Sequence, residues 1–336
     1  MEVWQLEEGF APDKLVKAER PEVEPGPGEV LLEMRAASLN YRDWLTINGG
    51  YGPRNTLPLV PLSDGAGEVI AVGAGVERVG IGDRVSPIFF PTWIGGEPTP
   101  AKFRLTLGGP LDGVLRRRMV IDAEAVVRVP EHLSDAEAAS LPCAGLTAWS
   151  AIATQGRVGP GDVVLVQGTG GVALFALQFA KLAGASVILI SSRDDKLARG
   201  RQLGADAVIN YRKAPDWDKE VKALTGGEGC DHIVELGGAD TLARSVRAAR
   251  VGGTISLIGV LSGADARFSL PLVVMRNLRL QGVTVGSRDG FEAMVRAMAA
   301  HRLHPVVDRV FRFEDAPKAF AAFAEARHFG KICIGY

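Results

Sequence analysis

The sequence predicts an α/β protein of two domains, one a doubly wound parallel sheet and the other rich in β-strands. The chain has 336 residues, which at about 150 residues per domain suggests two domains. Short apolar runs separated by glycine-rich turns fill the segment 1–122, whereas strands and helices alternate from about residue 160. The 41 glycines exceed the roughly 24 expected at average usage, which indicates many tight turns and close backbone approaches.

The β-rich segment is predicted from apolar runs at Glu29–Arg35, Gly67–Val72 and Arg84–Ile88. Turn clusters such as PGPGE and GAGVERVGIGD separate them, as between antiparallel strands. A helix is expected to begin at Ser134, because Glu137 follows at the capping-box spacing.

The later segment predicts a parallel sheet with helices on both faces, because strands and helices of suitable length alternate. We expect strands at Val163–Gln167, Ser186–Ser191, Ala207–Asn210, His232–Glu235, Gly253–Gly259 and Leu278–Val285, and helices at Val172–Ala183, Asp194–Leu203, Trp217–Leu224, Asp240–Ala249 and Gly290–His301.

Composition excludes several classes of protein. With 38 basic and 39 acidic residues the net charge is −1, so we expect neither nucleic acid nor an anionic membrane as a partner. Three scattered cysteines without a CxxC or Cys/His cluster argue against a disulfide scaffold and a structural zinc site.

The acidic start of the chain lacks a signal-peptide pattern, so a cytoplasmic location is expected. The apolar run Val172–Ile190 is interpreted as a helix, a glycine stop and a strand rather than a membrane span.

The strongest motif is Gly168-x-Gly170-x-x-Ala173, which fits G-x-G-x-x-G/A. It follows a predicted strand and opens a helix, the context in which this pattern binds the pyrophosphate of a dinucleotide. Gly168 permits the turn, Gly170 allows close approach, and the helix N-terminus offers free N–H groups. The residues expected to contact the cofactor here are Gly168, Thr169, Gly170, Gly171 and Val172.

The choice of cofactor is expected at the end of the second strand, where an Asp or Glu would bind the ribose diol of NAD. This chain has Ser191, Ser192 and Arg193, which suit a 2′-phosphate. We therefore favour NADP(H) over NAD(H). Asp194 and Asp195 are interpreted as the first turn of the next helix. Lys196 and Tyr211 are further possible phosphate contacts or ordinary surface residues.

From end to end the chain resembles the medium-chain dehydrogenase/reductase superfamily, in its zinc-free branch of quinone oxidoreductases and enoyl-thioester reductases. The motifs that carry the resemblance are PGPGEVLLEMRAASLNYRDW, PLVPLSDGAGEVIAVGAGV, GDRV, AASLPCAGLTAWSAI, VQGTGGVALFALQFAKLAGA, KLARGRQLGADAVINYR and HFGKICI. The resemblance implies a GroES-like catalytic domain from residues 1–122 and 288–336 and a Rossmann domain from residues 123–287. It also implies a homodimer joined by edge strands near Leu278–Val285.

The resemblance also tests for a catalytic metal. The zinc-dependent members carry ligands at positions that fall here on Asn40, on Leu62-Ser63-Asp64 and on Cys143. Only Cys143 is a residue of the expected type, and a catalytic zinc needs about three protein ligands. Residues Phe89–Gly109 replace the four-cysteine lobe. We therefore expect no zinc, and Cys143 is interpreted as a buried small hydrophobe.

Without zinc to stabilise an alkoxide, reduction of an activated double bond is the favoured reaction. By resemblance, Tyr51 is a proton donor or lines the pocket, since phenols are protonated at neutral pH. Asn40 could bind the substrate carbonyl or the nicotinamide ribose. Asp43 is a weaker catalytic candidate, expected rather to fix the backbone or pair with Arg42.

Substrate-pocket candidates are Tyr41, Phe89, Phe90, Trp93 and Ile94. Further cofactor candidates are Thr147, Gly259, Val260, Leu261, Val285, Gly286, Ser287, Phe329, Gly330 and Lys331.

Three functions remain open from the sequence. The favoured one is an NADPH-dependent reductase of quinones or α,β-unsaturated carbonyls. The second is a zinc-independent NAD(P)-dependent alcohol dehydrogenase acting on an activated alcohol. The third is an NADPH-binding protein with a structural or redox-sensing role, against which the LNYRDW and GGYG segments argue, because a pure binder would not need them.

Overall fold

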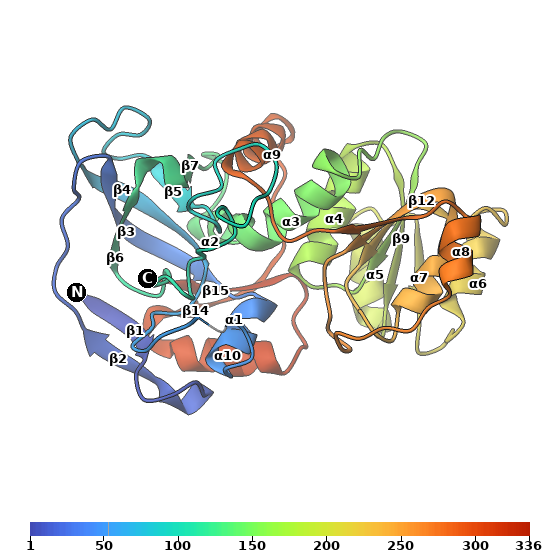
Figure 1. Cartoon of the computed structure of the whole chain (residues 1–336), viewed down its shortest axis with the longest axis horizontal. Coiled ribbons are helices and arrows are strands. Elements are labelled where there is room, and N and C mark those ends of the chain that lie inside the picture. Colours follow the sequence, from blue (N-terminus) through green and yellow to red (C-terminus); the bar gives the residue numbers. More distant parts are fainter. Residues whose placement is uncertain (53) are drawn as a thin grey trace. The chain divides into compact units, whose positions relative to one another are not determined.

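The chain forms two compact units in a computed structural model that describes residues 1–52 and 54–336. The first unit comprises Met1–Leu146 and Val285–Tyr336, and the second comprises Thr147–Thr284. Both ends of the chain, blue and red in Figure 1, therefore belong to the first unit. The division falls later in the chain than the boundary expected after residue 122, and slightly earlier than the one expected after residue 287.

The first unit takes up residues 123–146 because two of their elements complete its sheet and core. Strand β7 pairs with β5, and helix α2 packs on β3 and β4 through small side chains of the cluster Ala36, Ala66, Val129, Ala138 and Ala139. The predicted capping box of α2 is confirmed: the Ser134 N–H donates to Glu137 Oε2 at 2.8 Å and the Glu137 N–H donates to Ser134 Oγ at 3.3 Å.

The sheet of the first unit joins strands from both ends of the chain. Its order is β14-β15-β3-β4-β5-β7, with β6 also paired to β3, and the C-terminal strand β15 runs antiparallel to β3. The elements of this unit are β1 (Glu2–Leu6), β2 (Leu15–Glu19), β3 (Glu29–Ser38), α1 (Tyr41–Ile47), β4 (Asp64–Val72), β5 (Arg84–Pro87), β6 (Arg118–Asp122), β7 (Val126–Arg128), α2 (Asp135–Ala139), α9 (Arg288–His301), β14 (Val307–Arg312), α10 (Ala316–Ala324) and β15 (Lys331–Gly335).

The second unit is the predicted doubly wound fold. Its six strands follow the order β10-β9-β8-β11-β12-β13, and every pair is parallel. The strand order reverses between β8 and β11, where ligands of such sheets bind beyond the carboxyl ends of the strands. Its elements are β8 (Val163–Gln167), α4 (Gly171–Leu182), β9 (Ser186–Ser191), α5 (Asp194–Gln202), β10 (Ala207–Asn210), α6 (Trp217–Leu224), β11 (Cys230–Glu235), α7 (Leu242–Ala248), β12 (Ala249–Leu257), α8 (Leu270–Met275) and β13 (Arg279–Gly282); α3 (Leu146–Trp149) begins at the unit boundary.

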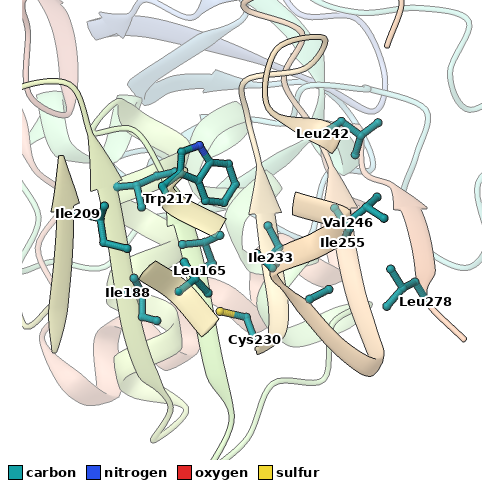
Figure 2. Close-up of a cluster of buried hydrophobic side chains, with 14 residues drawn as sticks. Leu165, Ile188, Ile209, Trp217, Cys230, Ile233, Leu242, Val246, Ile255 and Leu278 are labelled. Carbon is teal, nitrogen blue, oxygen red and sulfur yellow. The ribbon is translucent and has the colours of Figure 1, made fainter. Parts of the chain in front are cut away.

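A buried apolar cluster holds helices against this sheet (Figure 2). Leu165, Ile233 and Ile255 on three neighbouring strands are fully buried, and Trp217 at the start of α6 is 3% exposed. Burying one such side chain contributes about 1.5–3 kcal/mol. The cluster therefore fixes the strand ends that carry the candidate cofactor residues.

Most sequence boundaries agree with the structure within three residues, whereas β12 begins at Ala249 rather than at Gly253. Helix α7 begins at Leu242 rather than Asp240, because the preceding loop is held by hydrogen bonds to Glu235. Strand β13 covers only Arg279–Gly282 and, among the described strands, pairs with β12 alone, as an edge strand. Among the described residues no helix is long and apolar enough to cross a membrane.

Candidate functional site

The glycine turn after β8 has open space where a ligand would lie. Gly168 adopts a φ of +79° and its N–H donates to Ile190 O at 2.7 Å, which ties the turn to β9. A Cβ added at Gly168 or Gly170 would meet no protein atom within 4 Å, whereas one at Gly200 would lie 2.2 Å from Leu189. Packing against other residues therefore explains why position 200 is glycine, but it does not explain the glycines at positions 168 and 170. With α4 beginning at Gly171, its free N–H groups suit a phosphate.

The end of β9 carries the residues expected to choose the cofactor. Ser191 is buried, and Arg193 is an exposed residue whose guanidinium makes two hydrogen bonds to Asp195, at 3.0 and 2.8 Å. Asp194 accepts hydrogen bonds from Asn210 and Lys213, at 2.7 and 2.6 Å, and these two partners lower its pKa. Both carboxylates therefore have cationic partners of their own. Lys196 is buried and Tyr211 is 40% exposed.

A residue that the sequence did not single out organises the neighbouring strand end. The Glu235 side chain, 1% exposed at the end of β11, accepts hydrogen bonds from Gln167 Nε2 at 2.7 Å and from the backbone N–H groups of Gly237 and Gly238 at 3.0 Å. The hydroxyls of Thr241 and Ser245 also donate to it. Glu235 thus fixes the loop beside the strand-order reversal. The sequence signal that could have identified it is a glutamate at the end of a predicted strand, two residues before Gly237 and Gly238.

The other cofactor candidates of the second unit lie in different settings. A Cβ at Gly259 would lie 2.2 Å from Leu236 O, so backbone packing alone requires glycine there. Val260 and Leu261 are exposed by 50% and 59%. Thr147 is buried and its hydroxyl donates to Thr284 O at 3.1 Å.

In the first unit, the remaining cofactor candidates have structural roles. Ser287 Oγ caps α9 by accepting from the Gly290 N–H at 3.2 Å, and the Phe329 N–H donates to Asp308 Oδ1 at 3.1 Å. Gly330 has a φ of +90° and lies against Val306 O, so glycine is required by the backbone. Val285 is buried and Gly286 follows it at the start of this segment.

Asn40, Arg42 and Asp43 form a connected group at the start of α1. Asp43 is fully buried; its Oδ2 accepts from the Asn40 N–H at 2.8 Å and its Oδ1 from Arg42 Nη1 at 3.1 Å. These contacts assign Asp43 the capping and pairing roles expected as the alternative to catalysis.

Arg42 connects this group to the segment that replaces the zinc lobe. It is 7% exposed and donates to the carbonyl oxygens of Leu107, Gly108 and Gly109, at 2.9, 3.1 and 3.1 Å. Its guanidinium also lies over the ring of Tyr51, 5.0 Å from the centroid. Arg42 therefore fixes both the loop and the Tyr51 ring, whose residue is 37% exposed.

The aromatic residues expected to line a substrate pocket pack on one another. Phe89, Phe90 and Trp93 are exposed by 2%, 4% and 7%, and the Phe90 ring stacks on Phe103 at 4.8 Å. They form a small core of the segment Phe89–Gly109, and their place in a substrate pocket stays a prediction. Ile94 is half-buried, and Tyr41 on α1 is 40% exposed.

The positions tested for zinc lie together but do not fit the metal. Asp64 is fully buried and its two oxygens accept from Ser63 Oγ at 2.7 Å and from the Cys143 N–H at 2.9 Å. Lys331, 3% exposed, places its ammonium on Asn40 Oδ1. Desolvation and the charge of Asp64 raise the pKa of the Cys143 thiol, whereas zinc binds thiolates. No group of three or more potential ligand side chains occurs in the described ranges 1–52 and 54–336.

Cys143 lies in the π-helical turn Leu141–Gly145, where the residue is half-buried and its thiol is desolvated beside the charged groups of Asp64 and Lys331.

A GroES-like unit and a Rossmann unit with an open phosphate turn define a two-domain oxidoreductase. The alcohol dehydrogenase GroES-like domain family matches residues 26–131, and the zinc-binding dehydrogenase family matches residues 171–300. The chain belongs to the medium-chain dehydrogenase/reductase superfamily, whose members bind a nicotinamide cofactor.

Individual relatives are similar over nearly the whole chain. A zinc-type alcohol dehydrogenase-like protein of Schizosaccharomyces pombe is 41% identical, covering 92% of this chain and 91% of its own length. A Sinorhizobium meliloti 1021 protein assigned as an alcohol dehydrogenase has a crystal structure with a TM-score of 0.94 at 42% identity, covering 100% of this chain and 98% of its own. A structure of an NAD-dependent alcohol dehydrogenase matches with a TM-score of 0.92 at 35% identity over the full length of both chains.

Proposed function

We propose that this protein is a zinc-independent, NADPH-dependent reductase of quinones or α,β-unsaturated carbonyl compounds. The observation that carries the proposal is the buried group Arg42, Asp43, Asp64 and Lys331, in which two cations stand with two acids. A divalent metal would bring further positive charge into a buried group that already holds the cationic side chains of Arg42 and Lys331, beside a thiol whose pKa is raised by burial. Buried charges are costly unless they are paired.

The residues of the first unit suit the reduction of a conjugated carbonyl. When bound, a nicotinamide cofactor would supply the hydride for the β-carbon of the substrate, and negative charge would then develop on the carbonyl oxygen. Asn40 can donate a hydrogen bond to that oxygen, an interaction worth roughly 3–4 kcal/mol for one well-placed donor. Tyr51 can give its phenolic proton to the α-carbon, after which water restores the phenol.

The preference for NADPH rests on the end of β9. Two hydroxyls and Arg193 would donate to a 2′-phosphate. The Arg193–Asp195 pair is exposed, and exposed pairs contribute only about 0–1 kcal/mol, so the guanidinium can exchange that partner for a phosphate. Asp194 is held by Lys213 and Asn210, which limits its repulsion of the same phosphate.

A second function is favoured by the relatives, several of which carry alcohol dehydrogenase names. In that case the chain would oxidise an activated alcohol whose product carbonyl is conjugated. The third candidate is an NADPH-binding protein without turnover. It requires the same phosphate-binding turn as the first two, so cofactor binding alone does not distinguish it from them.

A substrate panel separates the three. Purified protein is mixed with NADPH and, in turn, a benzoquinone, a cyclic enone and an enoyl thioester, and with NADP⁺ and an allylic alcohol, each followed at the NADPH absorbance. We expect oxidation of NADPH with the first group and little reduction of NADP⁺ with the alcohol. Turnover of the alcohol alone would establish the second function, and cofactor binding without any turnover the third.

We also propose that the protein is a homodimer joined along β13. Within residues 1–52 and 54–336 this edge strand pairs only with β12, and α8 before it exposes Leu270, Val274 and Met275 by 67%, 70% and 78%. An exposed apolar patch next to an unpaired strand edge is typical of an interface. Light scattering should give twice the mass of the chain, and Met275→Glu should lower it, whereas Ile81→Glu, at a residue 71% exposed in the other unit, should not.

A further inference from the structure

Lys331 is a buried lysine whose ammonium contacts the backbone and side chain at the start of α1. It is the first residue of β15 and is 3% exposed. Its Nζ donates to Leu39 O at 2.6 Å and to Asn40 Oδ1 at 2.5 Å. An ammonium group has three donors and no acceptor, so the atom that faces it in each contact must be a hydrogen-bond acceptor.

This contact determines which way the Asn40 amide faces. Because Nζ cannot accept a hydrogen bond, the amide oxygen must lie on the lysine side and the Nδ2 group on the other side. Asn40 is 8% exposed, and its Nδ2 is a buried atom that needs acceptors for two N–H groups. Leaving such a donor unpaired costs about 1–3 kcal/mol.

The nearest acid is Asp64, and it can engage only part of this amide. Lys331 and a hydrogen bond from the Asn40 side chain both oppose the rise that burial causes in the pKa of Asp64. The amide nitrogen carries two N–H donors, so one of them faces Asp64. The second N–H calls for an acceptor that the described residues do not supply.

We propose that Lys331 is a positioning residue that holds the Asn40 amide so that Nδ2 donates to the carbonyl oxygen of the substrate. The inference rests on the reduction proposed above and names the residue that makes Asn40 competent for it. The positive charge of the Lys331 ammonium beside Oδ1 also polarises the Asn40 amide. This strengthens the amide N–H as a donor, because linked hydrogen bonds reinforce one another. The effect is largest when negative charge develops on the substrate oxygen, so Lys331 acts on the transition state more than on binding.

A double-mutant cycle with an enone substrate tests this coupling. Asn40→Ala should lower kcat about 10²-fold, and Lys331→Met should lower it by at least tenfold, with NADPH affinity unchanged within twofold. In the Asn40→Ala background, Lys331→Met should have no further effect on kcat, because its route of action is gone. Equal loss in both backgrounds would make Lys331 merely structural and overturn the proposal, as would an unchanged kcat in Asn40→Ala.

Asn40→Asp provides a second variant that does not disturb Lys331. The carboxylate keeps an acceptor for the ammonium but has no N–H to donate. We expect a melting temperature at least equal to that of Asn40→Ala and a loss of kcat equally large. A rate near that of the unchanged protein would contradict the assignment, whether or not Lys331→Met folds.

A measurement without turnover keeps the inference distinct from the proposed reaction. Inactivity of the unchanged protein on the whole panel would refute the reaction alone. In protein labelled with ¹⁵N at its five asparagines, the side-chain amide signal that disappears in Asn40→Ala identifies Asn40. Lys331→Met should shift this signal and leave the other four in place. An unmoved signal would show that Lys331 does not hold the amide.

Discussion

The backbone N–H of Cys143 donates a hydrogen bond to Asp64 Oδ2 at 2.9 Å. This contact joins two positions at which zinc-dependent relatives are expected to carry or adjoin metal ligands. Asp64 Oδ1 accepts from Ser63, so both oxygens already have protein donors. The arrangement is that of a hydrogen-bonded polar core, with Lys331 as its cation.

The metal content of the purified protein follows from this arrangement. We expect less than one-tenth of an equivalent of zinc by elemental analysis, and no loss of reductase activity after treatment with 1,10-phenanthroline. A zinc-containing alcohol dehydrogenase treated in parallel should be inhibited. Stoichiometric zinc that is removed together with activity would contradict the zinc-independent reaction.

Gly170→Ala separates cofactor binding from folding. Gly170 has a φ of −81°, which alanine adopts freely, and the added Cβ meets no protein atom. The melting temperature without cofactor should therefore change by no more than about 1 °C, while the methyl group blocks the approach of the pyrophosphate. Titration should show NADPH affinity reduced at least tenfold.

The matched control for this variant is Gly159→Ala. It is also a glycine of the second unit with no atom near the added Cβ, but it lies before β8. Its NADPH affinity should stay unchanged; equal weakening in both variants would mean that the turn has no special role.

Arg193→Ala tests the choice of cofactor. In the unchanged protein, NADPH should raise the melting temperature more than NADH at equal concentration, since tighter binding to the folded state gives more stabilisation. Removing Arg193 should weaken NADPH about 10- to 100-fold, the value of a hydrogen bond to a charged group, and leave NADH nearly unaffected. Lys219→Ala, another exposed cation paired with an aspartate in the same unit, is the control. Equal shifts by the two cofactors in the unchanged protein would refute the preference.

Local sequence rules predicted the parts of the fold whose causes are local. The bounds of β8, β9, β10 and α6 and the capping box at Ser134 agree with the structure, because strand patterns, caps and glycine turns each act within a few residues. The phosphate turn belongs to the same class, since Gly168 and Gly170 differ by only two positions.

The polar core of the first unit could not be predicted in this way. Lys331 reaches Asn40 across 291 positions of sequence, and Arg42 reaches Gly109 across 67. Nothing in HFGKICI indicates that its lysine is buried on an asparagine at the other end of the chain. The packing of the aromatic residues near Phe90 could not be predicted for a related reason: composition shows that a loop is apolar, but not whether its side chains pack on one another.

Tyr51→Phe tests the proton donor. The ring remains over Arg42, because the cation–π contact does not need the hydroxyl, so stability and NADPH binding should be kept. The rate on an enone should fall about 10²-fold or more, the usual contribution of a general acid. Tyr41→Phe, at a residue expected to line the pocket with its ring, removes only an exposed hydroxyl and should leave the rate within twofold. An unchanged rate in Tyr51→Phe would remove this residue from the mechanism.

His232 should make the second unit less stable in mild acid. It is 2% exposed on β11, its Nε2 lies 3.0 Å from Ser256 Oγ, and burial, with a smaller contribution from Arg279, lowers its pKa to about 4. Its ordinary pKa is about 6.5, so between these values the unfolded chain binds a proton that the folded chain does not. Stability is therefore lost as the pH falls below about 6.5, by about 2 kcal/mol between pH 7.5 and pH 5.

Urea unfolding at the two pH values, followed by tryptophan fluorescence, measures this loss. His232→Gln keeps a polar side chain beside Ser256 but cannot titrate, so its free energy of unfolding should depend less on pH by about the same 2 kcal/mol. The comparison uses the difference between the two pH values within each protein, which cancels any constant destabilisation by the substitution. His301→Gln, at an exposed residue of α9, should retain the full pH dependence. If His232→Gln also retains it, another group must be responsible for the acid sensitivity.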